Sequence, residues 1–387
     1  MVVKTLQLKR SDSLTPIHVL CVFGTRPEAI KMAPLVNEIK QHPELSGSVC
    51  VTGQHREMLD QVMCAFGITA DYDLNIMKPG QSLSSITADV LADLRSVLAD
   101  SKPDIVLVHG DTTTSFAAAL SAFYQQIPVG HIEAGLRTFN PYSPFPEEMN
   151  RTLTSKLATL HFAPTAVNRD NLARESITRH VFVTGNTVID ALLSLVYPDY
   201  SFHSPELQKI RFDSSRSILL TAHRRENFDQ PFQQIFTAVR KIADFYPDVQ
   251  FLYPVHRNPS VRDAAQQNLS GHPRIHLLDP LDVADMHNLI NRCYLVMTDS
   301  GGLQEEAPAL GKPVLVLRTE TERPEAVAMG TVKVSGIEAD DIFRDAALLL
   351  DDAVAYQTMS RAVNPYGDGL ASRRICEHII RFFLPSV

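Results

Sequence analysis

Short, continuously apolar runs alternate with longer helix-periodic segments from Ile17 onward, and this alternation limits the chain to an α/β fold. Apolar runs without polar interruptions are typical of parallel strands buried on both faces. In the first half the strand candidates are Ile17–Phe23, Ser48–Val51, Ile105–Val108, Pro128–Ile132, Leu160–Phe162 and Val181–Val183. The helix candidates between them are Glu57–Phe66, Leu83–Leu98, Ser115–Tyr124 and Glu147–Leu157. Because helices on both faces require right-handed crossovers, the pattern predicts a doubly wound sheet.

The same pattern restarts after the polar stretch Pro198–Ser215, which reads as a linker with surface elements. The second set of strand candidates is Ser217–Thr221, Gln250–Tyr253, Ile275–Leu277, Tyr294–Met297 and Val314–Leu317. The helix candidates here include Phe232–Phe245, Val283–Asn291 and Leu303–Leu310. A chain of 387 residues also exceeds what one compact core usually holds. We therefore predict two Rossmann-like domains, residues 1–185 and 186–368, with a C-terminal helix in 369–387 rejoining the first.

Charge and cysteine content restrict the partners and the cellular compartment that we expect for this protein. The formal net charge is -8, and nucleic-acid binding requires a basic surface, so nucleic acid is not expected as a partner. A few converging cations would still bind a small anion. The five cysteines form no CxxC pair, which favours reduced thiols. No signal-peptide pattern and no apolar run of about 20 residues occurs, so we expect a cytoplasmic protein without membrane contact.

The first strand runs into a helix start with two unexplained cations. Thr25 and Glu28 have the spacing of a capping box, and Pro27 is tolerated in a first helical turn. These residues need no function beyond starting the helix. Arg26 and Lys31 are different, because cations near a helix N-terminus are mildly unfavourable. A bound anion would compensate for them. The residues alone are compatible with an anion-binding site and with an ordinary helix start.

Three separate loops of the first half each present a carboxylate. Asp111 comes after the strand Ile105–Val108, Glu133 after the next strand, and Glu147 begins a helix together with Glu148. Asp111 is alternatively an N-cap, and either glutamate alternatively complements the helix dipole. The carboxyl ends of parallel strands meet at one sheet edge, so these groups are expected to converge. Convergence of this kind favours acid–base catalysis.

The second half contains a glycine turn suited to phosphate. The segment from Ser300 through Gly301 and Gly302 joins a buried strand to a helix, where free N–H groups and the helix dipole attract anions. One turn later, Glu306 is either a dipole partner or a ligand for ribose hydroxyls. Arg323 begins another helix, as Arg26 does. His223 directly follows a strand, although the basic cluster after it is alternatively a solvated loop.

Nine segments in this order resemble those of the bacterial non-hydrolysing UDP-N-acetylglucosamine 2-epimerase family. The resemblance extends from about Ile17 almost to the C-terminus. The segments are GTRPEAIKMAP (24–34), TGQHREMLDQV (52–62), HGDTTT (109–114), HIEAGLRT (131–138), FPEEMNRTLT (145–154), TGNTVIDAL (184–192), TAHRREN (221–227), TDSGGLQEEAP (298–308) and TERPEA (321–326). Each segment alone is weak evidence for this family, but all nine in this order are specific to it.

The resemblance implies a GT-B-like fold, with two doubly wound domains facing a central cleft that holds the substrate. It implies reversible C2 epimerisation of UDP-N-acetylglucosamine to UDP-N-acetylmannosamine, by elimination of UDP and re-addition to a 2-acetamidoglucal. No metal or other cofactor is implied, and a homodimer is. The implied catalytic residues are Asp111, Glu133, Glu147 and His223. The implied substrate-binding residues are Arg26, Lys31, Ser300, Gly301, Gly302, Glu306 and Arg323.

Some positions depart from the family pattern. Leu281 and Met286 stand where some members have a glutamine and an aromatic ring, which leaves the uracil contacts open. Residues that fit binding of a second, activating UDP-N-acetylglucosamine are Gln54, Arg224 and His256, whereas Glu57 and Gly80 depart from it. The alternatives are a hydrolysing epimerase that releases free N-acetylmannosamine, a GT-B glycosyltransferase and a non-catalytic nucleotide-sugar sensor.

Overall fold

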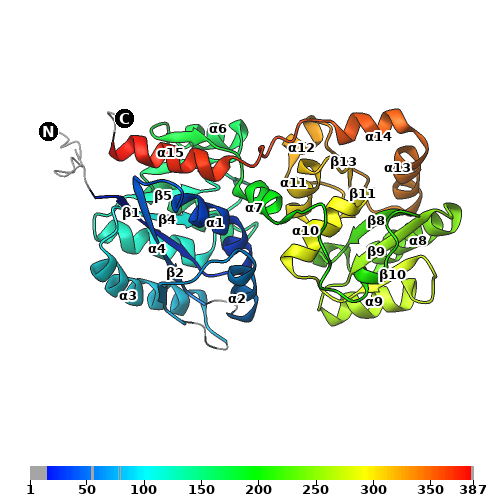
Figure 1. Cartoon of the computed structure of the whole chain (residues 1–387), viewed down its shortest axis with the longest axis horizontal. Helices are drawn as coiled ribbons and strands as arrows, with labels where there is room; N and C mark the ends of the chain where they lie inside the picture. The colour runs from blue at the N-terminus through cyan, green and yellow to red at the C-terminus, as the bar shows by residue number, and fades with distance from the viewer. Residues whose placement is uncertain (1–14, 54–55, 77, 79, 385–387) are drawn as a thin grey trace. The chain divides into compact units, whose positions relative to one another are not determined.

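The computed structural model describes residues 15–53, 56–76, 78 and 80–384, which form two compact units (Figure 1). Unit 1 contains the described residues up to Ala191 and those from Gly367 onward, and unit 2 contains Leu192–Tyr366. Each unit is built on one parallel sheet with helices on both faces. The predicted fold class, two doubly wound α/β domains, is confirmed.

Unit 1 is organised around a seven-stranded sheet in the order β3-β2-β1-β4-β5-β6-β7. Its strands are β1 (Ile17–Phe23), β2 (Leu45–Val51), β3 (Tyr72–Asp73), β4 (Ile105–His109), β5 (Val129–Ile132), β6 (Leu160–Ala163) and β7 (Val181–Val183). All neighbouring pairs are parallel. The strand order reverses between β1 and β4, where consecutive helices change face. In open α/β sheets, ligands bind at this switch point.

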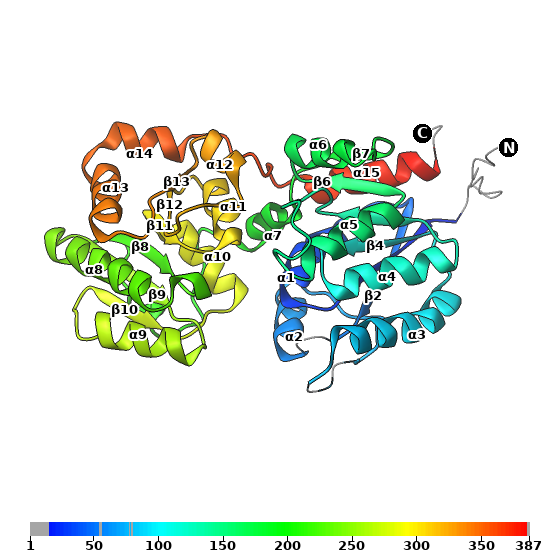
Figure 2. The same ribbon diagram turned by 180° about the vertical axis from the view of Figure 1, so that it is seen from behind.

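Two helical layers cover this sheet. The helices of unit 1 are α1 (Arg26–Ile39), α2 (Arg56–Ala65), α3 (Leu83–Ser101), α4 (Thr113–Tyr124), α5 (Glu147–Leu157), α6 (Ala166–Arg174), the first part of α7 (Thr187–Leu195) and α15 (Ala371–Phe383). α1 packs against α2 and α15, while α3, α4 and α5 pack in succession in the other layer (Figure 2). Between the layers, the core includes Leu20 and Val106 from the strands and Ala118 and Ala122 from α4.

The C-terminal helix α15 belongs to unit 1, where it lies against α1. Its N-terminus is capped by Asp190 on α7, whose carboxylate accepts the backbone N–H groups of Ala371 (3.2 Å) and Ser372 (2.7 Å). Asp190 is 8% exposed, and burial raises its pKa while these N–H groups oppose the rise. A carboxylate at a helix N-terminus satisfies free N–H groups and complements the dipole. This contact fixes the returning chain onto unit 1.

Unit 2 repeats the architecture with six parallel strands in the order β10-β9-β8-β11-β12-β13. Its strands are β8 (Arg216–Thr221), β9 (Val249–Pro254), β10 (Ile275–Leu278), β11 (Leu295–Thr298), β12 (Val314–Val316) and β13 (Val332–Val334). Its helices are α8 (Gln230–Phe245), α9 (Pro259–Leu269), α10 (Val283–Arg292), α11 (Gly301–Ala309), α12 (Pro324–Ala328), α13 (Ala339–Asp351), α14 (Ala353–Ser360) and the 3-10 turns η1 (Leu207–Lys209) and η2 (Arg225–Asn227). The switch point of this sheet lies between β8 and β11.

Several predicted elements agree with the structure, and two short edge strands are among the elements that were not predicted. The strand predicted as Ile17–Phe23 and the helix predicted as Glu147–Leu157 have the predicted bounds. β3 was missed because it has only two residues and is partly exposed. β13 was missed as well, with three residues on the edge of the sheet in unit 2.

No helix in the described part of the chain is long and apolar enough to cross a membrane.

Replacing Asp190 with alanine tests the anchoring of α15. We expect Asp190→Ala to lower the free energy of unfolding by about 1–2 kcal/mol, because two N–H groups lose their buried acceptor. The matched control is Asp368→Ala, which removes a 55% exposed side chain paired with Arg374 and should cost less than about 1 kcal/mol. Urea denaturation followed by circular dichroism measures both. Equal losses for the two variants would contradict the assignment of Asp190 as the anchor.

Candidate active site

The predicted residues of unit 1 follow the strands at its switch point. Arg26 and Lys31 lie in the first two turns of α1, directly after β1, and Arg26 is partly buried. Asp111 lies in the turn after β4, and Glu133 follows β5. The close approach of strand and loop here explains Gly24, since a Cβ at this position would lie 2.0 Å from the hydroxyl oxygen of Thr52.

A buried carboxylate, Glu28, connects the loop after β1 to the start of α4. Its Oε2 accepts the backbone N–H groups of Gly24 (3.1 Å) and Thr25 (2.8 Å), and its Oε1 accepts the hydroxyls of Thr112 (2.7 Å) and Ser115 (2.8 Å). The predicted capping box of Thr25 and Glu28 is confirmed. Four donors on one buried carboxylate hold both loops in a fixed geometry.

Asp111 is not the N-cap of α4. That position belongs to Thr112, whose hydroxyl accepts the N–H of Ser115 at 3.1 Å, so the alternative interpretation of Asp111 is wrong. The carboxylate of Asp111 pairs instead with the guanidinium of Arg151, and its carbonyl accepts the amide of Asn150 at 2.9 Å. Burial raises the pKa of Asp111, and Arg151 opposes the rise. A raised carboxyl pKa suits a group that exchanges protons near neutral pH.

Glu133 occupies a strained position. Its φ of 62° lies in the left-handed region, which is uncommon for residues other than glycine and recurs at functional sites. Its side chain is 8% exposed, and its Oε2 accepts the Lys31 ammonium and the Asn186 amide (2.9 Å). His109 Nε2 lies 3.7 Å from the same oxygen. Lys31, predicted to lie near a diphosphate, is therefore bonded to a candidate catalytic carboxylate in this structure.

The two glutamates in the first turn of α5 have different surroundings. Glu148 is buried and accepts the backbone N–H groups of Thr138 (3.0 Å) and Phe139 (2.9 Å), so it holds the loop after β5. Glu147 is only partly buried. It precedes Arg151 by four residues, a spacing that places both on one helix face. Glu147 therefore shares a face with the partner of Asp111.

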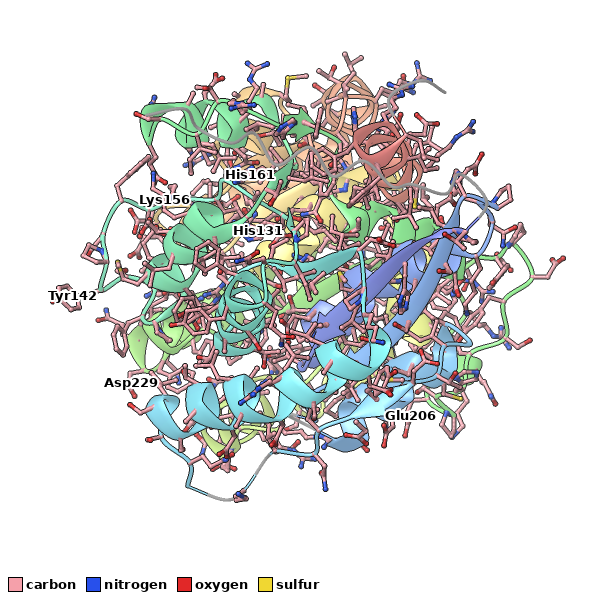
Figure 3. All side chains as sticks on the ribbon, turned by 90° about the vertical axis from the view of Figure 1, so that its left-hand side faces the viewer. His131, Tyr142, Lys156, His161, Glu206 and Asp229 are labelled. Atoms are coloured by element: carbon pink, nitrogen blue, oxygen red, sulfur yellow. The ribbon has the colours of Figure 1, made fainter. Side chains whose placement is uncertain are left out.

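Buried histidines lie beneath this edge of the sheet. His131 on β5 donates from Nε2 to the carbonyl of Gly110 (2.8 Å), and His161 on β6 is its neighbour across the strand pair (Figure 3). Burial lowers the pKa of His109 to about 4 and that of His131 to about 3. Both imidazoles are therefore neutral near pH 7. They pack beneath the loops that follow β4 and β5 without adding charge.

The switch point of unit 2 holds a second cluster, centred on Asp299 after β11. Asp299 is fully buried, and its Oδ2 accepts the backbone N–H groups of His223 (2.7 Å) and Arg224 (2.8 Å) and the amide of Asn227 (3.0 Å). The loop after β8 is thereby fastened to the end of β11. The imidazole of His223 stacks on that of His256, with ring centroids 5.3 Å apart.

Two arginines flank the N-terminus of α11. A Cβ placed on Gly301 would lie 3.7 Å from a terminal guanidinium nitrogen of Arg323 and 3.8 Å from one of Arg224. The backbone of Gly301, at the N-terminus of α11, is thus bordered by two cations. Ser300 is the N-cap, and its hydroxyl makes no capping hydrogen bond. Arg323 is held in place by the buried carboxylate of Glu305. This arrangement suits a phosphate-bearing ligand.

Three further predicted positions of unit 2 lie on or next to α10 and α11. Glu306 lies one turn into α11, with its Oε2 3.8 Å from Nε2 of the buried His287 on α10. Leu281 is 8% exposed and precedes α10, which carries the partly buried Met286. Of the residues that fit a second nucleotide-sugar site, Gln54 lies outside the described residues.

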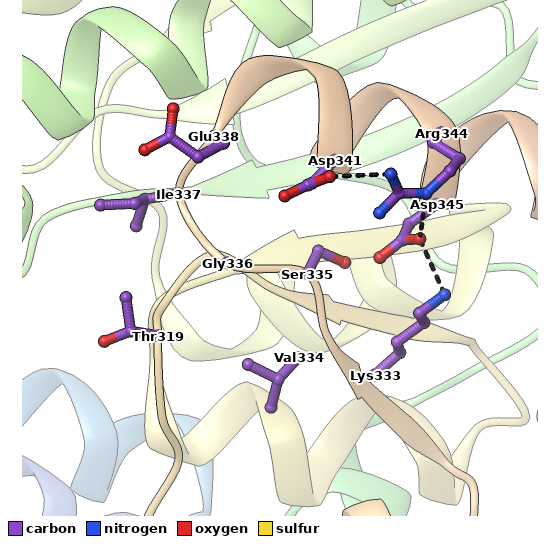
Figure 4. Close-up of a pocket in the computed structure, with 10 residues that line it drawn as sticks. All are labelled: Thr319, Lys333, Val334, Ser335, Gly336, Ile337, Glu338, Asp341, Arg344 and Asp345. Atoms are coloured by element: carbon purple, nitrogen blue, oxygen red, sulfur yellow. Dashed lines mark hydrogen bonds and ion pairs between the residues drawn. The ribbon is translucent and has the colours of Figure 1, made fainter.

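A separate cavity of about 530 Å³ opens at the edge of unit 2, between β13 and α13 (Figure 4). Four of its charged side chains are paired, Lys333 with Asp345 (2.7 Å) and Arg344 with Asp341 (2.8 Å). None of the predicted site residues lines it. We therefore do not assign the chemistry to this cavity.

Several residues of the two clusters were missed by sequence reasoning. Arg151, Asn186 and Asp299 occur inside recognised segments, but their side-chain partners are distant in sequence. Arg151 is 40 residues from Asp111, and Asp299 is 76 residues from His223. A polar residue directly after a buried strand was the available signal for Asp299.

Comparisons with known proteins agree with this geometry. Residues 37–380 match the family model described as UDP-N-acetylglucosamine 2-epimerase. The chain belongs to the UDP-N-acetylglucosamine 2-epimerase family. A Bacillus subtilis relative named UDP-N-acetylglucosamine 2-epimerase is 56% identical over 365 residues, which cover 94% of this chain and 95% of the relative.

Solved structures of this family share the fold. A Neisseria meningitidis UDP-GlcNAc 2-epimerase bound to UDP-GlcNAc is 51% identical, with a TM-score of 0.83 over 94% of this chain and 100% of that one. A Staphylococcus aureus protein, MnaA, solved with UDP, is 48% identical, with a TM-score of 0.86 over 96% of this chain and 98% of that one. The fold of this epimerase family member is GT-B-like.

The buried histidines predict how stability depends on pH. Their folded pKa values lie below the ordinary 6.5, so the unfolded chain binds protons more tightly. Stability is therefore complete above about pH 6.5 and falls as the pH drops toward 4, by about 1.4 kcal/mol per pH unit for each histidine. Urea midpoints measured across this range check the expectation.

A substitution separates this effect from general acid sensitivity. His131→Asn should flatten the pH profile of the urea midpoint. The exposed His203, whose pKa is raised by Asp282, has the opposite sign, so His203→Gln should not flatten it. A profile for His131→Asn with the slope of the unsubstituted protein would contradict the assignment.

Proposed function

We propose that this protein interconverts UDP-N-acetylglucosamine and UDP-N-acetylmannosamine without hydrolysis, by eliminating UDP and adding it back. The observation that carries the proposal is the anion-binding geometry at the N-terminus of α11, where Gly301 is flanked by Arg224 and Arg323. Family relatives solved with UDP-GlcNAc and with UDP support a nucleotide-sugar ligand for the same fold.

The diphosphate is assigned to the cluster of unit 2. Ser300 would donate its hydroxyl, while Gly301 and Gly302 would donate backbone N–H groups. Arg323 contributes its charge, His223 contacts the phosphates, and Glu306 binds the ribose hydroxyls. Fixed donors and charges of this kind stabilise a departing diphosphate by several kcal/mol. From unit 1, Arg26 and Lys31 are further candidates for contacts with the same substrate.

Carboxylates of unit 1 are assigned to proton transfer at C2 of the sugar. A carboxylate does not remove this hydrogen while the C1–O bond is intact, because the carbon is not acidic enough. Cleavage of the bond to UDP builds positive charge at C1 and makes the C2 proton removable. The products are UDP and 2-acetamidoglucal, and protonation on the opposite face followed by re-addition of UDP inverts C2. Asp111, Glu133 and Glu147 would supply the base and the acid.

The different partners of Glu133 and Asp111 support different roles for them, one as the base and the other as the acid. Lys31 and Asn186 both donate to Glu133, which favours its ionised form. Burial favours the protonated form of Asp111, with Arg151 opposing. Two carboxyls in such different surroundings can be in opposite protonation states at one pH, as acid–base catalysis at a single carbon requires.

Several finer features belong to the same proposal. We place the reaction in the cytoplasm, since the five cysteines are unpaired and four are buried, as in a reducing compartment. The product is proposed to supply surface polysaccharide synthesis. No metal or nicotinamide is invoked, because the elimination needs only acid–base groups and phosphate ligands. A homodimer is proposed from the family resemblance, and sedimentation velocity tests it.

Solvent deuterium at C2 tests the proposed reaction. In deuterium oxide, UDP-N-acetylglucosamine should gain deuterium at C2, and both epimers should remain linked to UDP in the mass spectrum. Asp111→Asn, Glu133→Gln and Glu147→Gln should each slow label uptake by about 10²- to 10⁴-fold. Free N-acetylmannosamine as the product would favour the hydrolysing alternative. Binding without any label uptake would favour a sensor.

Gly301→Ala tests the phosphate assignment. The new methyl group would fit in ordinary contact with both guanidinium groups, so the fold should be retained. It would occupy the space assigned to phosphate oxygens, and we expect UDP affinity to fall at least about tenfold, about 1.4 kcal/mol. Uridine, which lacks phosphates, is the internal control and should bind almost unchanged. Equal losses for UDP and uridine in calorimetry would contradict the assignment.

A further inference from the structure

Five buried carboxylates in the described part of the chain share one bonding pattern. Each accepts the backbone N–H groups of two consecutive residues, and each is at most 8% exposed. The five are Glu28, Glu148, Asp190, Asp285 and Asp299. In four of them, both carboxylate oxygens accept hydrogen bonds. Asp299 is the exception.

The exceptional oxygen of Asp299 is Oδ1. Its other oxygen, Oδ2, accepts three donors, whereas Oδ1 is buried and accepts no hydrogen bond. A buried carboxylate oxygen without a donor has lost its hydration with no hydrogen bond to replace it, so such an atom calls for an explanation. Nδ1 of His223 lies 3.3 Å from Oδ1. A small rotation of the imidazole would bring an Nδ1 proton onto this oxygen.

We propose that Asp299 and His223 form a carboxylate–imidazole pair, in which Asp299 is a positioning residue that keeps the proton on Nδ1 and presents Nε2 to the diphosphate. This inference rests on the proposed function for the identity of the ligand. The pair itself is a property of the free protein. A carboxylate on one ring nitrogen fixes the tautomer and the orientation of the ring, as in catalytic triads.

The charges around His223 determine when it takes a second proton. Asp299 at the end of β11 favours the imidazolium, while burial, the stacked His256 and the adjacent Arg224 disfavour it. Burial has the largest effect, so the pKa of His223 is lowered in the free protein. A dianionic diphosphate beside Nε2 shifts the balance toward the imidazolium. UDP binding is therefore coupled to proton uptake by His223.

His256 does not replace His223 in this role. Its Nδ1 accepts the backbone N–H of Asn258 at 3.1 Å, so this nitrogen carries no proton. Two stacked imidazolium rings would also repel each other. The carboxylate of Asp299 lies beside His223, so it is this ring that the carboxylate orients.

The first test uses the unsubstituted protein and requires no catalysis. Nitrogen-15 NMR of labelled histidine, with His223→Gln to assign the signal, reports which ring nitrogen carries the proton. We expect His223 to be protonated at Nδ1 without ligand and at both nitrogens with UDP bound. A His223 protonated at Nε2 alone in the free protein would overturn the proposal.

The second test compares Asp299→Asn with a matched control. Asp285→Asn alters another buried carboxylate of unit 2 that accepts two consecutive backbone N–H groups, but it does not contact His223. Titration calorimetry with UDP in buffers of different ionisation enthalpy measures proton uptake. We expect affinity of the unsubstituted protein to fall with rising pH near neutrality, by up to tenfold per unit.

The expected outcomes of this comparison are distinct. Asp299→Asn should lose most of the proton uptake and of the pH dependence, with UDP affinity at least tenfold weaker near pH 7. Asp285→Asn should retain the proton uptake and the pH dependence of UDP binding. Equal behaviour of the two variants would overturn the proposal. If His223 is protonated at Nδ1 but the protein has no epimerase activity, the proposed function is rejected. The Asp299–His223 pair is then still supported.

Discussion

Buried carboxylates that accept pairs of backbone N–H groups are the constraint on which both sites depend. Parallel strands end at a common edge, and the loops that leave this edge contain N–H groups without partners in the sheet. Glu28 and Glu148 hold such loops in unit 1, and Asp299 does so in unit 2. Fixing the loops in this way positions the functional side chains without help from a ligand.

The chemistry follows from what these fixed loops present. In unit 1 they present carboxyl groups in contrasting surroundings, with the Lys31 ammonium on Glu133 and burial acting on Asp111. In unit 2 they present guanidinium groups beside the N-terminus of α11. They also present the imidazole of His223 beside Oδ1 of Asp299, an oxygen that accepts no hydrogen bond. One set suits proton transfer and the other suits a diphosphate that leaves and returns. An enzyme that breaks and remakes a sugar–phosphate bond requires both.

Local sequence patterns were sufficient to predict much of the fold and of the candidate sites. The features that were not predicted depend on side chains that pair over long sequence distances. The apolar run of β1 and the capping box at Thr25 are determined by neighbouring residues, so the sequence was sufficient to predict them. Asp111 and Thr112 are adjacent and both good N-caps, and only the ion pair with Arg151, 40 residues away, separates their roles. The pairing of Lys31 with Glu133 spans 102 residues and was likewise not predictable from local pattern.

The proposed reaction requires that UDP detach from the sugar and return to it during each turnover. Positional isotope exchange tests this most directly, with oxygen-18 placed in the bridge between C1 of the sugar and the β-phosphate. Once UDP is free, rotation of its terminal phosphate makes the three oxygens equivalent. We expect the label to move from the bridge to non-bridging positions in the recovered UDP-sugar, at a rate no slower than epimerisation. Epimerisation with all of the label retained in the bridge would contradict it.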